Sequence, residues 1–266
     1  MVSFTGHVLP VLATIAVWFF ATGLIAWAAN APRESYGRSL VWAGVVGAGG
    51  MLCVIVSARM TGAGGAYLGF AGAMAIWGWH EFAFLTGGVT GPRRSPCPEG
   101  AHGIVRFAKA SAAVVHHEIA LAATAAILIA LCWGQPNPIG AQVFVLLFAL
   151  RLVAKLNLFA GMPYASTDIL PRHLAYLTSY FGPNRFTVLL ALSIAGTLVL
   201  AGWLGALAAE TSGPGASVAA SLLFAMAALG ALEHLFFALP LRDGALWGWA
   251  IAARDKRAHT NAMRGL

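Results

Sequence analysis

The stretch VLPVLATIAVWFFATGLIAWAA, residues 8–29, decides the class of fold. It contains no Asp, Glu, Lys or Arg, and it is long enough to cross a bilayer, because a transmembrane helix needs roughly 20 apolar residues. The first Lys or Arg of the chain is Arg33, so the stretch lacks the basic leader of a cleavable signal peptide. We therefore expect a retained transmembrane helix.

Further apolar stretches follow, and together they predict an all-α, polytopic membrane bundle of about seven transmembrane helices. They span roughly residues 38–58, 64–86, 108–132, 139–160, 187–209 and 215–241. The composition agrees, since 59% of the residues are hydrophobic and only 9% are charged, whereas a soluble domain carries roughly 25% charged residues. Seven spans, together with their connections, account for the 266 residues and leave none over for a soluble domain. We therefore expect one integral membrane domain over residues 1–266.

The basic residues fall on alternate connections between these stretches. Of the 16 Lys and Arg residues, 13 lie on one side, namely Arg33, Arg38, Arg93, Arg94, Arg106, Lys109, Arg172, Arg185, Arg242, Arg254, Lys256, Arg257 and Arg264, and only Arg59 lies on the other. Because Lys and Arg collect on cytoplasmic loops, we expect the N-terminus outside and the C-terminus in the cytoplasm. The net charge of +7 then indicates a lipid bilayer as partner, and no nucleic acid.

Residues 170–181, LPRHLAYLTSYF, connect the fifth and sixth spans. Leu170, Leu174, Leu177 and Phe181 follow one another at spacings of four, three and four. This spacing predicts a short amphipathic helix at the membrane interface.

Polar and ionisable residues inside the apolar stretches are the candidate functional residues. They are His80, Glu81, His116, His117, Glu118, Arg151, Lys155, Asn157, Glu233 and His234. A charge at the bilayer centre costs about 2.5–3.5 kcal/mol on insertion scales, so such residues usually face the bundle interior. Counted along each span, they lie at a similar depth, ~8–14 Å from the cytoplasmic boundary at ~1.5 Å per residue. We predict that Glu81, His117, Lys155 and Glu233 converge in one pocket.

Three interpretations of this polar layer are open at the level of sequence. In the first, the layer is a structural network in which the glutamates neutralise Arg151 and Lys155. In the second, it is a non-haem metal site, whose candidate ligands are His80, Glu81, His117, Glu118, Glu233 and His234. In the third, it is a cofactor-binding site for a tetrapyrrole or a lipid head group, with histidine as an axial ligand and Arg or Lys pairing with acidic groups.

The connection that follows the third span carries a second candidate. Residues 90–99, TGPRRSPCPE, contain three prolines, Arg93, Arg94 and Cys97. The arginine pair is suited to a phosphate or an acidic partner, or to anchoring the loop on the cytoplasmic side. The basic tail at residues 254–259 favours contact with anionic lipid.

Several of these stretches resemble one known family. Residues 77–97 (WGWHEFAFLTGGVTGPRRSPC), 116–118 (HHE), 151–161 (RLVAKLNLFAG) and 170–181, together with 9–23 (LPVLATIAVWFFATG), resemble the photosynthetic complex assembly protein family called PuhE. The resemblance implies a multi-pass protein of the inner, cell or intracytoplasmic, membrane of an anoxygenic phototrophic bacterium. It carries over no catalytic residue. Residues 163–168 (PYASTD) depart from the family pattern.

Two functions follow from these observations. The resemblance implies a membrane assembly factor for the photosynthetic reaction centre and core antenna that modulates the supply or handling of bacteriochlorophyll. Its partners would be reaction-centre or light-harvesting polypeptides, and its cofactor a tetrapyrrole such as bacteriochlorophyll or a precursor. The polar layer alone also fits a membrane-embedded His/Glu metal-dependent oxidoreductase of pigment or lipid metabolism. The sequence leaves open whether the protein is an enzyme.

Overall fold

The structure, a computed structural model, describes residues 2–165, 167, 169–241 and 246–250. Within these residues it is helical, with long helices α1 (Leu9–Ala29), α2 (Tyr36–Ser57), α3 (Ala63–Leu85), α4 (Gly103–Cys132), α5 (Ile139–Ala160), α6 (Val188–Glu210) and α7 (Pro214–Ala238). Short helices η1 (Phe4–Val8), η2 (Arg33–Ser35) and η3 (Arg172–Tyr180) complete the described part. The predicted all-α bundle is confirmed, and each predicted span coincides with one long helix.

Six of these helices are long and apolar enough to cross a membrane: α1 with η1, α2 with η2, α4, α5, α6 and α7. Helix α3 is as long as its neighbours, but its glycines and the His80–Glu81 pair make it less apolar. It lies inside the bundle, where it packs against α1, α2, α4, α5 and α7. The chain is therefore a multi-pass membrane protein in which α3, with His80 and Glu81, is shielded by the other helices.

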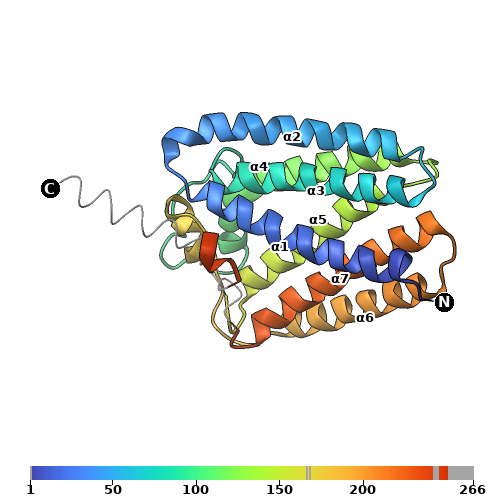
Figure 1. Cartoon of the computed structure of the whole chain (residues 1–266). Coiled ribbons are helices and arrows are strands. Elements are labelled where there is room, and N and C mark those ends of the chain that lie inside the picture. The colour runs from blue at the N-terminus through green and yellow to red at the C-terminus, as the bar shows by residue number, and fades with distance from the viewer. Residues whose placement is uncertain (1, 166, 168, 242–245, 251–266) are drawn as a thin grey trace.

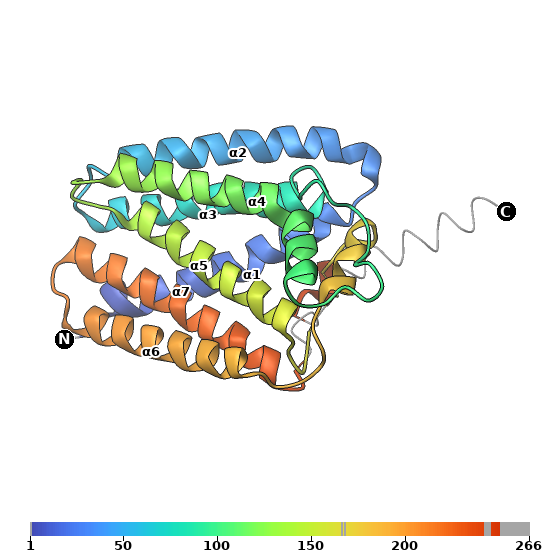
Figure 2. The same ribbon diagram turned by 180° about the vertical axis from the view of Figure 1, so that it is seen from behind.

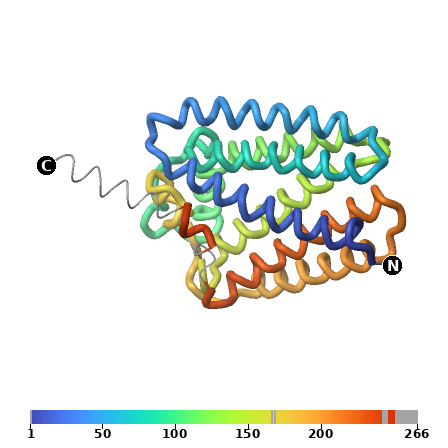
Figure 3. Tube along the Cα trace, in the orientation of Figure 1, coloured from blue at the N-terminus to red at the C-terminus, as the bar shows by residue number. Residues whose placement is uncertain are grey.

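The long helices run roughly along one direction, and their connections gather at the two ends of the bundle (Figure 1). Helices α2 and α3 form one hairpin, and α6 and α7 form another. The view from behind shows α5 crossing the bundle between these hairpins and diverging from α4 (Figure 2). The Cα trace shows α1 lying across α7 near the N-terminus (Figure 3).

Glycines set the closest approach of helices within the bundle. A Cβ atom on Gly50 would lie 2.7 Å from the carbonyl oxygen of Gly72, and one on Gly72 would lie 2.6 Å from that of Gly50. Since real Cβ atoms essentially never come within 3.0 Å of another heavy atom, only glycine allows α2 and α3 to pack at this distance. Gly50 and Gly72 therefore allow α2 and α3 to pack closely within this chain.

The predicted amphipathic helix at residues 170–181 is present as η3, a 3₁₀-helix over Arg172–Tyr180. Its buried residues are Leu174, Leu177 and Tyr180, a spacing of three that matches the three residues per turn of this helix type. Phe181 lies beyond its end and is half-buried. The leucine pattern was interpreted correctly as amphipathic, and Tyr180 rather than Phe181 completes the buried face.

Basic residues concentrate at the end of the bundle where α3 ends and α4 begins. In the described residues this end carries Arg33, Arg38, Arg93, Arg94, Arg106, Lys109, Arg172 and Arg185, whereas Arg59 lies at the opposite end. The remaining basic residues of the predicted charge bias, Arg242, Arg254, Lys256, Arg257 and Arg264, and the whole basic tail at 254–259 lie outside the described residues. We call the end with the many basic residues the basic end.

Candidate functional site

A cavity of about 650 Å³ lies inside the half of the bundle that is nearer the basic end. Residues of α1, α3, α4, α5 and α7 line it, together with the segment before and within η3 and with Trp247. The volume falls in the range of small-molecule pockets, ~300–1,000 Å³. Its ionisable lining residues are Glu81, Glu118, Arg151, Lys155 and Glu233, and most of the remaining lining is apolar.

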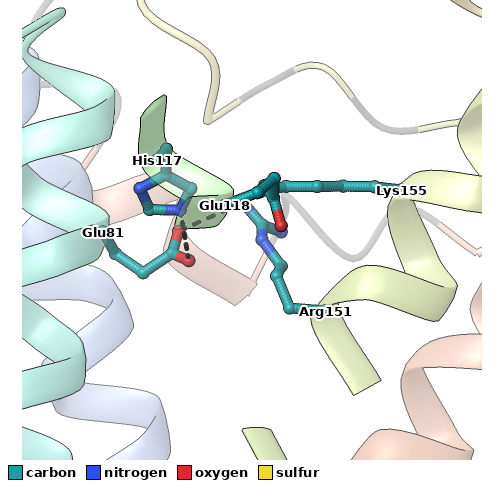
Figure 4. A network of polar contacts seen from close by, with 5 residues as sticks. All are labelled: Glu81, His117, Glu118, Arg151 and Lys155. Carbon is teal, nitrogen blue, oxygen red and sulfur yellow. Dashed lines mark hydrogen bonds and ion pairs between the residues drawn. The ribbon is translucent and has the colours of Figure 1, made fainter. Parts of the chain in front are cut away.

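Two ion pairs cross this cavity and link three helices (Figure 4). The guanidinium of Arg151 on α5 donates a hydrogen bond of 3.1 Å to Glu81 Oε2 on α3. One helical turn further along α5, the ammonium of Lys155 donates to Glu118 Oε1 on α4. Because Arg151 and Lys155 are four residues apart, they share a face of α5 and reach two different helices.

His117 on α4 lies beside the Glu81 carboxylate. Its ring is fully buried, Nε2 lies 3.9 Å from Glu81 Oε1, and the ring centroid lies 4.7 Å from that of Phe84. His80 is also buried and shares a hydrogen bond of 3.0 Å between its Nε2 and the hydroxyl of Thr124. The predicted convergence of Glu81, Lys155 and Glu233 on one pocket is confirmed, and His117 joins them through Glu81 but does not line the cavity.

Three of the candidate residues lie elsewhere. His116 is exposed on the outer face of α4, because neighbouring residues on a helix point about 100° apart and His117 occupies the inner face. Asn157 is buried against α6 and donates a hydrogen bond of 2.8 Å to the Ser193 hydroxyl. His234 is buried on α7, and its Nδ1 lies 2.7 Å from the carbonyl oxygen of Gly230. These three residues do not line the cavity.

The arrangement bears on the two cofactor interpretations. Among the residues that the structure describes, no three His, Cys, Asp or Glu side chains lie close enough together to hold a metal ion. A tetrapyrrole with an axial histidine does not fit the donor set either, since His80, His117 and His234 are absent from the cavity lining. The cations that would pair with its acidic groups, Arg151 and Lys155, are already engaged by carboxylates.

Aromatic side chains form part of the site, and none of them is among the polar candidate residues. Trp18, Trp77, Phe84, Phe236 and Trp247 all line the cavity. The Trp18 and Trp247 rings meet edge to face at 5.1 Å, although they are far apart in the sequence. Trp18, Phe84 and Phe236 lie inside apolar spans, where an apolar residue carries no sequence signal, so the packing of the helices is what reveals them.

The loop of residues 86–102 and η3 form a cap over the basic end. Arg93 donates to the hydroxyl of Tyr180, and that hydroxyl donates a hydrogen bond of 3.0 Å to the Ser95 carbonyl oxygen. Arg106 donates to the carbonyl oxygens of Phe159 and Tyr180 at 3.1 and 2.6 Å. Arg93 and Arg106 therefore hold the cap together, and of the pair Arg93 and Arg94 only Arg94 is exposed to a partner.

Helix α4 begins at Gly103 rather than near residue 108, and this extra turn carries Arg106.

His173 attaches the other side of the cap to the bundle. Its ring lies against Gly87, whose φ is +78°, and within 6.0 Å of the Tyr36 ring centroid. Burial, together with the charge of Arg33, lowers the pKa of His173 from its usual value. The folded cap therefore favours the neutral imidazole.

Comparison with known proteins places the chain among sequences without an assigned activity. The model of the family described as "Protein of unknown function (DUF3623)" matches residues 4–258. A protein of Rhodobacter capsulatus, described as an uncharacterized 30.4 kDa protein in the puhA 5′ region, is 37% identical over 258 residues, which cover 96% of this chain and 94% of the relative. No solved structure matches the chain.

Proposed function

We propose that this chain, which belongs to the DUF3623 family of unknown function, is a membrane assembly factor for the photosynthetic reaction centre and core antenna. The observation that carries the proposal is the 37% identical relative, which is described by its position in the puhA 5′ region. The resemblance of residues 77–97 and 151–161 to the PuhE family supports the same function.

The basic end is the surface through which we propose that partners dock. The cap is a folded platform, because Arg93 bonds its loop to Tyr180 of η3, and Arg106 of α4 bonds both η3 and α5. Exposed cations remain on it, among them Arg94 and Arg172. We place this end in the cytoplasm and the N-terminus outside, in a bacterial inner membrane, because Lys and Arg of multi-pass proteins collect on the cytoplasmic side.

The experiment replaces the Rhodobacter capsulatus relative with a tagged copy of this chain and purifies it from membranes of cells grown in the light. Reaction-centre or light-harvesting polypeptides should co-purify. The double variant Arg94→Glu/Arg172→Glu should lose most of them, while Arg59→Glu at the opposite end serves as the matched control. Recovery of none of these polypeptides with the unchanged chain contradicts the proposal.

The orientation has a separate test. A phosphatase reporter, which is active only outside the cytoplasm, is fused after Leu266 and, in a second fusion, after Arg59. We expect activity from the Arg59 fusion alone. The reverse pattern contradicts the assignment of the basic end to the cytoplasm.

The metal-dependent oxidoreductase has no comparable observation behind it. It needs ligands that converge, and the candidate ligands His80 and His234 lie on separate contacts with Thr124 and Gly230. We therefore advance the assembly function alone.

A further inference from the structure

We propose that the cavity binds a neutral amphipathic molecule, with a carbonyl or hydroxyl oxygen at its polar end and a long apolar chain, which enters sideways from the bilayer. The shared chemistry covers acyl lipids and isoprenoid compounds. This inference goes beyond the assembly function and does not depend on it. It rests on the cavity lining, on the charges around Arg151 and on the exposure of leucines at the edge of the cavity.

The shape and lining of the cavity favour an apolar chain. It is as large as a ligand pocket, and aromatic residues such as Trp18, Trp77 and Phe236 cover its walls. Ionisable groups stand in one region, where α3, α4 and α5 exchange ion pairs. A molecule that is apolar along most of its length and polar at one end matches this distribution.

The edge of the cavity indicates how such a chain enters. Leu152 and Leu156 on α5 both line the cavity and are 39% and 37% exposed. Figure 2 shows α5 running apart from the middle of α4, and the two helices meet again at the basic end, where the Phe107 and Phe159 ring centroids lie 5.5 Å apart. In a multi-pass protein, exposed leucines on the outer side of a helix face acyl chains. The lining therefore continues to the lipid-facing surface, which provides a lateral route.

The charges around the cavity select the polar end of the ligand. Arg151 and Lys155 line it as cations, and each already pairs with a carboxylate, that of Glu81 or Glu118. An anionic head group would lie among these carboxylates in a medium of low dielectric constant, where like charges repel strongly. A cationic head group would compete with Arg151 and Lys155 for the same partners. A neutral head group avoids both costs.

Arg151 provides the hydrogen-bond donors for a neutral oxygen. Its side chain is 30% exposed, compared with 13% for Glu81, 20% for Glu118 and 17% for Lys155. A guanidinium carries five N–H donors, and within the described residues Arg151 uses one of them, toward Glu81. A carbonyl or hydroxyl oxygen at this place would accept from the remaining donors.

Tryptophan fluorescence provides the readout, because Trp18, Trp77 and Trp247 line the cavity and bromine quenches a ring that it touches. The purified full chain, in phosphatidylcholine nanodiscs, is titrated with dibromo-octadecyl probes that end in an alcohol, a carboxylate or a quaternary ammonium. We expect saturable quenching by the alcohol at the lowest concentration. Lipid-facing tryptophans contribute a background that rises linearly with all three probes.

Two glycine variants form a matched pair. A Cβ atom on Gly78, which lines the cavity, would lie 3.5 Å from Ile25, so Gly78→Leu fits its backbone and fills the cavity. A Cβ atom on Gly49 would meet nothing within 4 Å, so Gly49→Leu adds the same side chain outside. Saturable quenching should disappear in the first variant and persist in the second. If both variants keep the saturable quenching, the cavity is not the binding site.

The head-group assignment is tested at Arg151. Arg151→Gln should weaken binding of the alcohol about tenfold, the effect of one hydrogen bond to a charged donor. If this variant does not fold, Arg151→Lys keeps the charge beside Glu81 but removes the guanidinium donors, and the same weakening is expected. Equal affinity for the carboxylate and the alcohol overturns the neutral head group. Mass spectrometry of lipid extracted from the purified chain then separates acyl from isoprenoid ligands.

Discussion

Replacing Lys155 with methionine removes one partner of the ion pair that joins α5 to α4. The Lys155 ammonium donates to Glu118 Oε1 and lies 5.1 Å from the centroid of the Phe84 ring. Methionine retains the apolar stem of lysine and so fills much the same volume. The substitution therefore leaves the Glu118 carboxylate without its cation and changes little else.

The size of the effect follows from the burial of the pair. Breaking a buried ion pair by removing one partner costs ~3–5 kcal/mol, because an uncompensated charge stays behind. Lys155 and Glu118 are 17% and 20% exposed, which places the cost at the lower end, about 3 kcal/mol. Glu118→Gln should cost a similar amount by stranding the ammonium. The double variant buries no charge and should cost only about 1 kcal/mol.

The assay is reversible unfolding in mixed micelles of a mild detergent and dodecyl sulfate, followed by the loss of helical circular dichroism. The two single variants, the double variant and the unchanged chain form a double-mutant cycle, and Lys109→Met, which removes an exposed cation at the same end, is the control. Single losses below about 1 kcal/mol, or a double loss equal to the sum of the single losses, would refute the reasoning.

Three other perturbations probe the packing and the cap. In Gly50→Leu, the new Cβ would lie 2.7 Å from a carbonyl oxygen of α3. This variant should lower the free energy of unfolding by about 3 kcal/mol, because overpacking costs ~1–3 kcal/mol or more. The control Gly49→Leu should leave unfolding in mixed micelles unchanged. Tyr180→Phe removes the hydroxyl that bonds the cap, so limited proteolysis should cut residues 93–97 faster. Because burial and Arg33 lower the pKa of His173, the neutral ring stabilises the cap above pH ~6.5, and this stability is lost as pH falls from there toward the lowered pKa. Hydrogen exchange in η3 should accordingly rise at pH 5, but not in His173→Gln.

The helices could be predicted from the sequence because each span is a continuous apolar run, and such runs are interpreted by length and composition alone. The ends of the helices were harder to predict. α4 starts earlier than its apolar run because Arg106 belongs to its first turns and bonds to Phe159 and Tyr180. Those two partners lie about 50 and 75 residues away in the chain, and no local pattern indicates them.

The polar site was predictable as a set but not residue by residue. Depth along each span brought Glu81, Lys155 and Glu233 together correctly, because charged side chains inside a membrane protein face its interior. Depth says nothing about which way a helix is turned. Adjacent residues His116 and His117 therefore received equal weight, although one is exposed and the other fully buried.

The polarity of α3 is best understood together with its position. Glu81 on this helix would be costly in lipid, and α3 is surrounded by α1, α2, α4, α5 and α7, so no lipid needs to contact its polar face. The same enclosure requires partners for the carboxylate, which Arg151 supplies from α5. Close packing against α2 through Gly50 and Gly72 fixes the rotation of α3. The two glycines thus orient Glu81 toward Arg151. The packing of the bundle and the geometry of its polar site therefore depend on the same helix, α3.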